Sequence, residues 1–204
     1  MPILLIQRGN AFVHDLVPLT PLGGDGAQSQ EIKGITIREM PDFAYASIAM
    51  RLGRKIGFGR AAKKAIGIVP PTPGESAAIK AGEGLLTIFW TGADQWMVEA
   101  PYATHLDLAA QLHGVLKDNA SVTEQNDGWA RFDLKGESCV AVLERLSAVD
   151  SAKMHAGAAT RTSVEHVSCF LLCREPSQHF SVICPRSFAE SLFHSIVITA
   201  KSAL

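Results

Sequence analysis

A hairpin signal in the middle of the chain constrains the fold most. Two apolar stretches, LLTIFWTG at 85–92 and QWMVEA at 95–100, meet at the turn TGAD at 91–94. β-Branched and aromatic residues bounded by Gly and Asp are typical of two strands joined by a tight connection. We therefore predict a β-hairpin with a four- or five-residue loop, and hence an antiparallel sheet.

Strand and helix patterns alternate along the rest of the chain. Alternating or continuous apolar runs predict further strands, and apolar residues spaced three and four apart predict helices. The predicted strands lie at 34–40, 44–52, 121–125, 128–134, 157–162, 165–174 and 179–184, and the predicted helices at 59–67, 104–116, 137–146 and from 187 onward. Hairpins mixed with helices, without a repeat of fixed period, favour an α+β fold in which helices cover antiparallel sheets.

Three of these helices carry sequence signals at their ends. Gly67 should end the first, because glycine readily adopts the left-handed conformation found at helix C-termini. Thr104 with Asp107, and Ser187 with Glu190, have the three-residue spacing of capping boxes. We therefore expect Thr104 and Ser187 to cap the second and the last helix.

Residues 1–33 differ in composition from the body at 34–204. Their segment LTPLGGDGAQSQ, at 19–30, is rich in Gly, Pro and small polar residues, which are typical of loops. So long a loop rarely stays free of contacts in a compact domain. We expect an extended N-terminal arm that wraps the body or reaches a partner.

The composition favours a soluble globular protein. Of the 204 residues, 47% are hydrophobic and the formal net charge is −1, which argues against binding to nucleic acid or to a membrane surface. No apolar run has the length needed to span a bilayer. The start, MPILLIQRGNAF, has no basic segment before its apolar run and no clear cleavage site. We therefore expect a cytoplasmic protein with reduced cysteines.

Cys139 follows a strand and a glycine turn, a place where enzymes often hold a nucleophile. The first turn of a helix can lower the pKa of a thiol there. However, Cys139, Val142, Leu143 and Leu146 have the spacing of one apolar helix face. No histidine lies in a recognisable motif beside this cysteine, so we interpret Cys139 as a core residue.

The remaining candidate motifs are weaker. Cys169 and Cys173 lie four residues apart on one face of a predicted strand and could face the core or a metal. Two thiolates form only half of a typical zinc site, and His166, at an odd spacing from both, is expected on the opposite face. The glycines of PLGGDG lack the flanking strand and helix of a phosphate-binding loop. The residues therefore indicate no catalytic, metal or cofactor site.

A basic run at 51–64, RLGRKIGFGRAAKK, is the most distinctive surface signal. It contains no acidic residue. It is therefore either a solvated basic helix together with the residues that lead into it, or a docking face for an acidic partner. Its charged residues are Arg51, Arg54, Lys55, Arg60, Lys63 and Lys64.

Several segments together resemble the gamma subunits of heterotetrameric sarcosine oxidases. The resemblance extends from about residue 35 to 197 and rests on the order and spacing of its motifs. It departs from the family pattern at turns, where this chain has Gly92-Ala93, Gly136-Glu137 and Val149-Asp150. The motifs are GADQW at 92–96, DGWARFDLKG at 127–136, GAAT at 157–160 and RSFA at 186–189.

The resemblance implies a fold similar to the folate-binding aminomethyltransferases, with two linked subdomains. It also implies a complex with alpha, beta and delta subunits that oxidatively demethylates sarcosine to glycine. FAD, FMN, NAD and tetrahydrofolate would be bound by the other subunits, and a small subunit would bind zinc. This chain would be a structural subunit that contributes no catalytic residue and binds no cofactor.

Two alternatives remain open from the sequence. The chain could serve a related N-methyl amine oxidase, since the departures at turns fit a divergent relative. It could also be a stand-alone folate-binding or one-carbon transfer protein of the aminomethyltransferase type, although it is short for that role.

Overall fold

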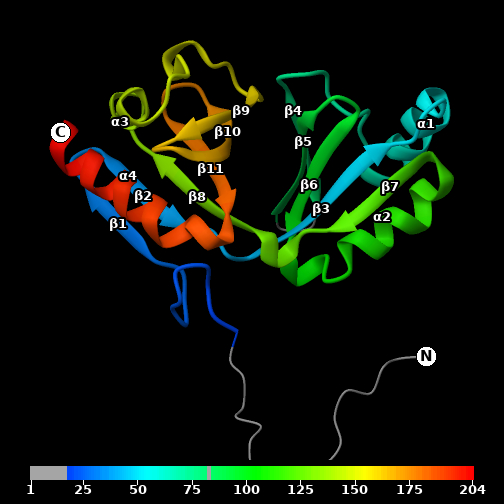
Figure 1. The fold of residues 1–204 in the computed structure, drawn as a ribbon, viewed down its shortest axis with the longest axis horizontal. Coiled ribbons are helices and arrows are strands. Elements are labelled where there is room, and N and C mark those ends of the chain that lie inside the picture. The colour runs from blue at the N-terminus through cyan, green and yellow to red at the C-terminus, as the bar shows by residue number, and fades with distance from the viewer. Residues whose placement is uncertain (1–17, 82–83) are drawn as a thin grey trace, which may run out of the picture.

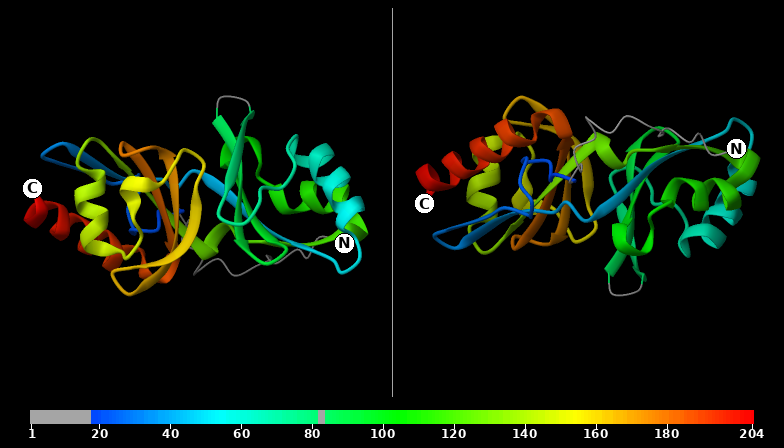
Figure 2. Two further views of the ribbon diagram at one scale, coloured as in Figure 1. Left: turned by 90° about the horizontal axis from the view of Figure 1, so that it is seen from above. Right: turned by 90° about the horizontal axis from the view of Figure 1, so that it is seen from below.

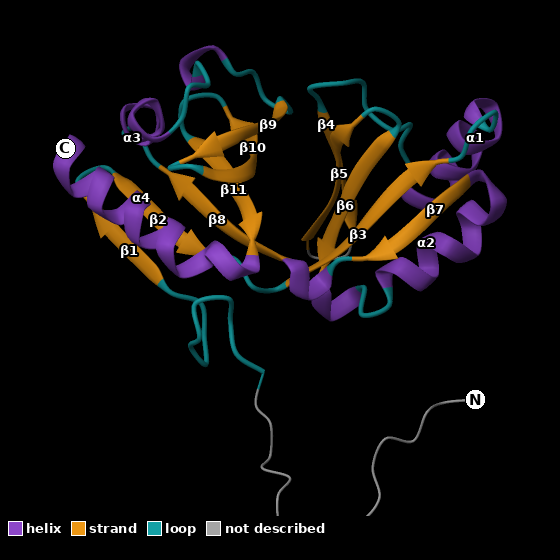
Figure 3. Ribbon diagram, viewed as in Figure 1, coloured by secondary structure: helices purple, strands orange, loops and turns teal. Residues whose placement is uncertain are grey.

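The protein has two antiparallel sheets, each covered by helices on its outer side (Figure 1). The computed structural model describes residues 18–81 and 84–204. Strands form the two inner layers and helices lie outermost (Figure 3). The predicted α+β class with antiparallel sheets and covering helices is confirmed.

The first sheet has six strands in the order β1-β2-β8-β11-β10-β9. Their bounds are β1 Ser29–Ile32, β2 Ile35–Glu39, β8 Trp129–Lys135, β9 Ala159–Val164, β10 Val167–Glu175 and β11 His179–Pro185. Helices α3 (Cys139–Leu146) and α4 (Ala189–Ala203) pack on its outer face. Phe132, Leu143 and Ile196 are fully buried between this sheet and these helices.

The second sheet has five strands in the order β4-β5-β6-β3-β7. Their bounds are β3 Phe43–Met50, β4 Ser76–Ala81, β5 Gly84–Gly92, β6 Gln95–Pro101 and β7 Ala120–Glu124. Helices α1 (Lys55–Ile66) and α2 (Leu108–Leu116) cover its outer face, around a core that includes Ile88 and Leu116. No helix among the residues described is long and apolar enough to cross a membrane.

A third core lies between the two sheets, so their central strands are buried on both faces. Trp96 and Met97 illustrate this, because they are neighbours on β6 and both are buried. Trp96 stacks on Phe58 of α1, with ring centroids 5.1 Å apart, whereas Met97 faces the other sheet. The apolar residues of this inter-sheet layer are Tyr45, Phe89, Met97, Ala159, Phe170, Leu172 and Ile183.

The second sheet is inserted into the first along the chain. All its strands lie between β2 and β8, which pair with each other. The chain crosses between the sheets through residues 40–42 and through the short helix η3 (Asn126–Gly128), and the two sheets lie side by side in both views of Figure 2. Away from these crossings, the Ser76 N–H donates to the Gly157 carbonyl at 2.6 Å. This bond links the edge of the second sheet at β4 to the edge of the first sheet near β9.

Every predicted strand and helix is present, but two strands escaped prediction. β4 has the sequence SAAIKA, whose alanines have a weak strand propensity, so its pairing with β5 decides its conformation. β1 is short and polar, as edge strands often are, and it pairs with β2. The end of the expected N-terminal arm is therefore part of the first sheet, and residues 1–17 of the arm lie outside the described residues.

Some boundaries differ from the predictions. α1 begins at Lys55, four residues before the predicted start, and ends as expected where Gly67 adopts a φ of 81°. The predicted hairpin is present, but its connection has only two residues, Ala93 and Asp94. The pairing register of β5 and β6 shifts between Trp90 and Gly92, so Thr91 forms a β-bulge and the rest of the predicted turn belongs to the strand.

Both predicted capping boxes are wrong. Thr104 ends a 3-10 helix, η1 (Tyr102–Thr104), and its hydroxyl donates to the Pro101 carbonyl at 3.3 Å. Ser187 lies within another, η5 (Arg186–Phe188), so that Phe188 occupies the N-cap of α4. The 3-10 turns displace both side chains from the cap, and neither helix has a side-chain cap bond. The two remaining 3-10 helices are η2 (Lys117–Asn119) and η4 (Ser151–Lys153).

Candidate functional site

Four charged residues lie between the sheets and form the inter-sheet cluster; three of them are buried and the fourth, Arg174, is 15% exposed. Glu99 comes from β6 of the second sheet, Arg131 and Asp133 from β8 and Arg174 from β10 of the first. The Arg131 guanidinium donates to both Asp133 oxygens, Nε to Oδ1 at 2.7 Å and Nη2 to Oδ2 at 2.9 Å. Arg131 Nη1 reaches Glu99 Oε1 at 3.3 Å, and Arg174 donates to the same oxygen. Ion pairs thus join the two sheets.

Further polar side chains complete this network. Ser181 donates its hydroxyl to Asp133 at 2.7 Å and accepts the Arg174 Nε–H at 2.9 Å. His179 Nε2 lies 3.0 Å from the other Asp133 oxygen, and Arg174 Nη1 donates to the Thr87 hydroxyl at 3.2 Å. Nearly every polar atom of the cluster therefore has a partner, as buried charges require.

The network keeps its carboxylates ionised. Burial alone would raise the pKa of Glu99, but Arg174 and Arg131 outweigh it and hold that pKa below its usual value. Burial likewise opposes ionisation of Asp133, yet its hydrogen bond with His179 and the Arg131 charge hold its pKa far below the usual range. Neither carboxyl is placed to exchange a proton near neutral pH, so the cluster is suited to joining the sheets.

The sequence analysis missed this cluster. Charged residues that alternate with apolar ones also occur on strands with one face in water, so the pattern WARFDLK does not reveal burial on both faces. The available signal was Arg131 and Asp133, two opposite charges two residues apart and hence on one face of a strand. Glu99 in QWMVEA was a second signal, because its neighbours on both sides are apolar.

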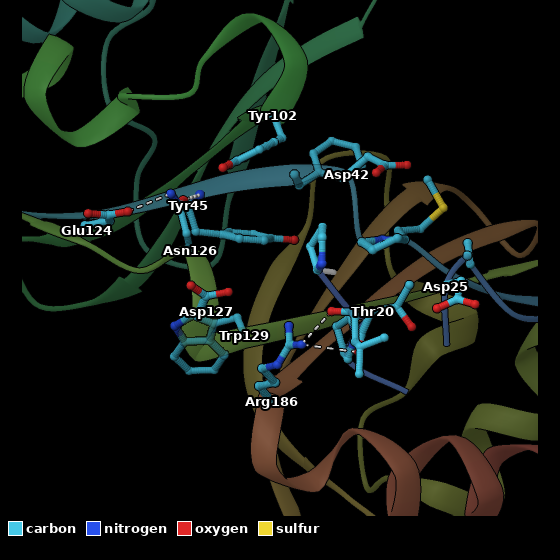
Figure 4. Close-up of a pocket in the computed structure, with 18 residues that line it drawn as sticks. Thr20, Asp25, Asp42, Tyr45, Tyr102, Glu124, Asn126, Asp127, Trp129 and Arg186 are labelled. Carbon is cyan, nitrogen blue, oxygen red and sulfur yellow. Dashed lines mark hydrogen bonds between the residues drawn. The ribbon is translucent and has the colours of Figure 1, made fainter. Parts of the chain in front are cut away.

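A cavity of about 650 Å³ opens where the chain crosses between the sheets, and we call it the junction cavity (Figure 4). The loop before β1, the start of β3, η3 and η5 enclose it. Its principal polar and aromatic lining residues are Thr20, Asp25, Asp42, Tyr45, Tyr102, Glu124, Asn126, Asp127, Trp129 and Arg186.

Hydrogen bonds fix several walls of the junction cavity. Asn126 Oδ1 accepts the Tyr45 backbone N–H at 2.8 Å, and its Nδ2 donates to Glu124 at 2.8 Å. The Trp129 indole N–H donates to the Gln125 side chain at 3.1 Å. Arg186 Nη2 donates to the backbone carbonyls of residues 19 and 20, at 2.9 and 3.2 Å. The cavity wall is therefore held by contacts within the chain.

The predicted basic docking residues lie together on the outside of the second sheet. All six are exposed, on α1 and the turn before it, and we call this surface the basic face. Arg51 has an ion pair with Asp118, with a distance of 3.6 Å between nitrogen and oxygen. Leu52 and Ile56, also exposed, lie within the same segment. The structure thus unites these residues on one surface, away from the junction cavity, and their docking role stays a prediction.

The cysteines belong to the core of the first sheet. Cys139 is fully buried with Val142, Leu143 and Leu146, as predicted, and burial raises the pKa of its thiol to about 12. Cys169 and Cys173 share that core, which confirms their common face. His166 lies in the β9–β10 turn with a φ of 65°, so it does not occupy the opposite strand face expected for it. The described residues contain no group of three or more His, Cys, Asp or Glu placed to hold a metal.

Comparisons with known proteins support the fold. No family model and no curated protein sequence matches this chain. A chain of heterotetrameric sarcosine oxidase from Corynebacterium sp. U-96, solved in complex with pyrrole 2-carboxylate, superposes with a TM-score of 0.72 at 22% identity. The match covers 84% of this chain and 88% of that one.

The aminomethyltransferase T of the glycine cleavage system from Bartonella henselae also superposes, with a TM-score of 0.56 at 12% identity. This chain has an aminomethyltransferase-like fold. The match covers 80% of this chain but 48% of the aminomethyltransferase, so the chain spans about half the length of that enzyme. The predicted resemblance in fold is therefore confirmed, and at these identities the likeness concerns the fold alone.

Proposed function

We propose that this chain is a non-catalytic, structural gamma-type subunit of a heterotetrameric sarcosine oxidase. The observation that carries the proposal is the extent of the structural match, which covers most of both chains for the sarcosine oxidase. The aminomethyltransferase, by contrast, is matched over only half its length. A stand-alone transferase would be expected to retain more of that enzyme.

The chemistry of the described residues agrees with a structural role. The buried carboxylates are engaged in ion pairs, and the buried Cys139 thiol has a raised pKa. In this proposal the alpha, beta and delta subunits are the partners in a cytoplasmic complex. Those subunits hold FAD, FMN, NAD and tetrahydrofolate and oxidise sarcosine to glycine.

The basic face is the surface that we propose for docking. Its exposed cations can meet an acidic partner surface, and the exposed Leu52 and Ile56 can be buried by the same contact. Charged rims around apolar anchors are common at protein interfaces, where the charges speed association and the anchors supply affinity.

Co-purification tests the proposal. The tagged full-length chain, expressed in its own host, should be recovered with flavoprotein subunits, and the complex should form peroxide when given sarcosine. The chain expressed alone should show no flavin absorbance and no sarcosine oxidation. Peroxide formation with another N-methyl amine, but not with sarcosine, would instead assign the chain to a related oxidase.

Calorimetric titration of the lone chain with tetrahydrofolate separates the remaining alternative. A structural subunit should give no binding heat, whereas tight binding would favour a one-carbon transfer protein. Stoichiometric flavin on the isolated chain would contradict the proposal outright.

A further inference from the structure

Two of the four buried cysteines lie opposite each other on neighbouring strands. β10 and β11 are adjacent in the first sheet (Figure 1), and their antiparallel ladder pairs Phe170 with Ile183. One step further along the same ladder, Cys169 of β10 lies opposite Cys184 of β11, and both positions are within the strands. Both side chains point to the same side of the sheet, because both belong to the core beneath α3 and α4.

The backbone pattern brings these two cysteines close together. Opposite residues of an antiparallel ladder alternate between hydrogen-bonded pairs and closer pairs without backbone bonds, whose Cα atoms are about 4.5 Å apart. Cys173, four residues along β10 from Cys169, directs both its N–H and its carbonyl away from β11, to Ala158 and Gly157 before β9. The same alternation turns the backbone of Cys169 toward β9, so its pair with Cys184 is of the closer kind. A disulfide requires Cα atoms about 4.4–6.8 Å apart, which this pair satisfies.

The other two cysteines have no such neighbour. Cys173 lies opposite a phenylalanine of β11. It is four residues from Cys169 on the same strand, which at about 3.3 Å per residue separates their Cα atoms by about 13 Å, too far for a disulfide. Cys139 lies on α3 with its thiol 3.5 Å from the Gln178 carbonyl, at the opposite end of β11 from Cys184. The fold therefore singles out one pair of thiols.

We propose that Cys169 and Cys184 are a modification site, a dithiol that hydrogen peroxide converts into a cross-strand disulfide. One sulfur, as thiolate, attacks a peroxide oxygen, so that an S–O bond forms, the O–O bond breaks and hydroxide leaves. The second sulfur then attacks the resulting sulfenic acid, and the S–S bond forms as the S–O bond breaks. Each sulfur loses one electron, and the peroxide takes up two electrons and the two thiol protons to leave as two water molecules.

The surroundings keep both thiols reduced until peroxide accumulates. Burial raises the pKa of Cys169 and of Cys184 to about 12, so both are protonated near neutral pH and react slowly. Cys169 contributes to the raised pKa of Cys184, as expected for two sulfurs that lie close together. Once one sulfur is oxidised, its neighbour is already in place, which favours the disulfide over further oxidation.

The pair lies near the ends of its strands, where a small oxidant can enter. Cys169 follows the start of β10 by two residues, and Cys184 precedes the last residue of β11. On its other side Cys169 pairs with Thr162 of the edge strand β9, which with Leu146 lines a hollow in the surface. Local opening at such an edge requires far less free energy than global unfolding. The site does not depend on the proposed function, although the oxidase of that proposal would itself supply the peroxide.

Peptide mapping of the full-length chain tests the proposal. The folded protein is incubated with hydrogen peroxide, its remaining thiols are blocked with iodoacetamide in urea, and it is digested with trypsin without reductant. We expect the loss of two of the four thiols, reversed by dithiothreitol, and one disulfide between the tryptic peptides 162–174 and 175–186. Fragmentation of the linked peptides distinguishes Cys169 from Cys173, which lies in the same peptide.

Matched variants confirm the assignment. Cys184→Ala should form no disulfide within the chain, because the sulfur opposite Cys169 is gone. The control, Cys173→Ala, removes another buried cysteine of the first sheet and should form the disulfide to the same extent as the wild type. Thermal unfolding verifies that each variant folds, and the mapping of the wild type needs no variant.

Several results would overturn the proposal. They are the absence of a disulfide in the folded, peroxide-treated chain, a disulfide through Cys139 or Cys173, and oxidation of Cys169 to a sulfinic acid in its place. A disulfide-linked dimer on a non-reducing gel would count against it equally, since the second thiol would then belong to another copy. None of these results bears on the role as a sarcosine oxidase subunit, because the chain is tested alone and without sarcosine.

Discussion

The inter-sheet cluster and the basic face use similar charged side chains in opposite settings. Between the sheets, Glu99 and Arg131 are almost fully buried, and each has an ionised partner. On α1, Lys63 and Lys64 are exposed to water. A charge removed from water must be paired to be tolerated, whereas a hydrated charge needs no partner. The comparison teaches that burial decides whether a charge holds a fold together or remains free for a partner.

Breaking the inter-sheet cluster should have the largest effect. Glu99→Ala removes a buried carboxylate and leaves the half-buried Arg174 without its ionised partner, and should lower the free energy of unfolding by about 3 kcal/mol. Urea unfolding measures the change, with Glu144→Ala on the exposed side of α3 as control, expected within about 0.5 kcal/mol. If both variants lost equal stability, the cluster would not be what joins the sheets.

Acid should weaken the same cluster without any mutation. Because the pKa values of Glu99 and Asp133 are lowered in the folded state, their contribution is full above about pH 5, beyond both unfolded values, and is lost as the pH falls through the folded values. Unfolding at pH 6 and pH 3 should show this loss, and Asp133→Asn should reduce it by about 1 kcal/mol. The groups that face these carboxyls are Arg131, Arg174, His179 and Tyr45. Parallel profiles of stability against pH for the variant and the wild type would show that Asp133 is not a source of the acid sensitivity.

A polar group introduced into the apolar core tests what burial costs where no charged partner is present. Cys139→Ser places a hydroxyl where a thiol packs among apolar residues, and should cost about 1–3 kcal/mol of stability. In the native protein the thiol should also resist iodoacetamide at pH 8, because burial raises its pKa to about 12. Rapid alkylation of folded protein, detected at Cys139 by mass spectrometry, would show that the site is open.

The smallest effect on stability should come from the basic face. Substituting Arg60, Lys63 and Lys64 by alanine should change the free energy of unfolding by less than about 0.5 kcal/mol per site. The same triple variant should associate more weakly with the partner subunits at low salt, and the difference should shrink as salt is added. Unchanged association at low salt would leave the surface without the proposed role.

The sequence predicted those features that depend on local pattern. The stripe from Cys139 to Leu146 identified α3 and its buried face, because helical spacing alone determines which residues share a face. β4 and the capping of α4 were not predictable, since pairing with β5 and the 3-10 turn at Ser187 decide them.

The candidate sites also divide into those visible in one stretch of sequence and those that only tertiary contacts create. The basic face is contiguous along the chain, so the amino-acid sequence alone reveals its run of positive charges. The inter-sheet cluster joins Glu99, Asp133 and Arg174, which lie far apart along the chain and meet only because the two sheets pack together. Tyr45 gave no signal either, because only the packing of the two sheets buries its side chain beside Glu99.

The insertion of the second sheet within the first has a consequence for biosynthesis. Residues 43–124 form a contiguous unit whose strands can all pair once that segment has left the ribosome. β2, although made earlier, must wait for β8, so the N-terminal hairpin emerges first and is incorporated late. During that interval an unpaired strand edge is exposed to other chains, and the nascent protein is then most open to aggregation or to assistance by chaperones.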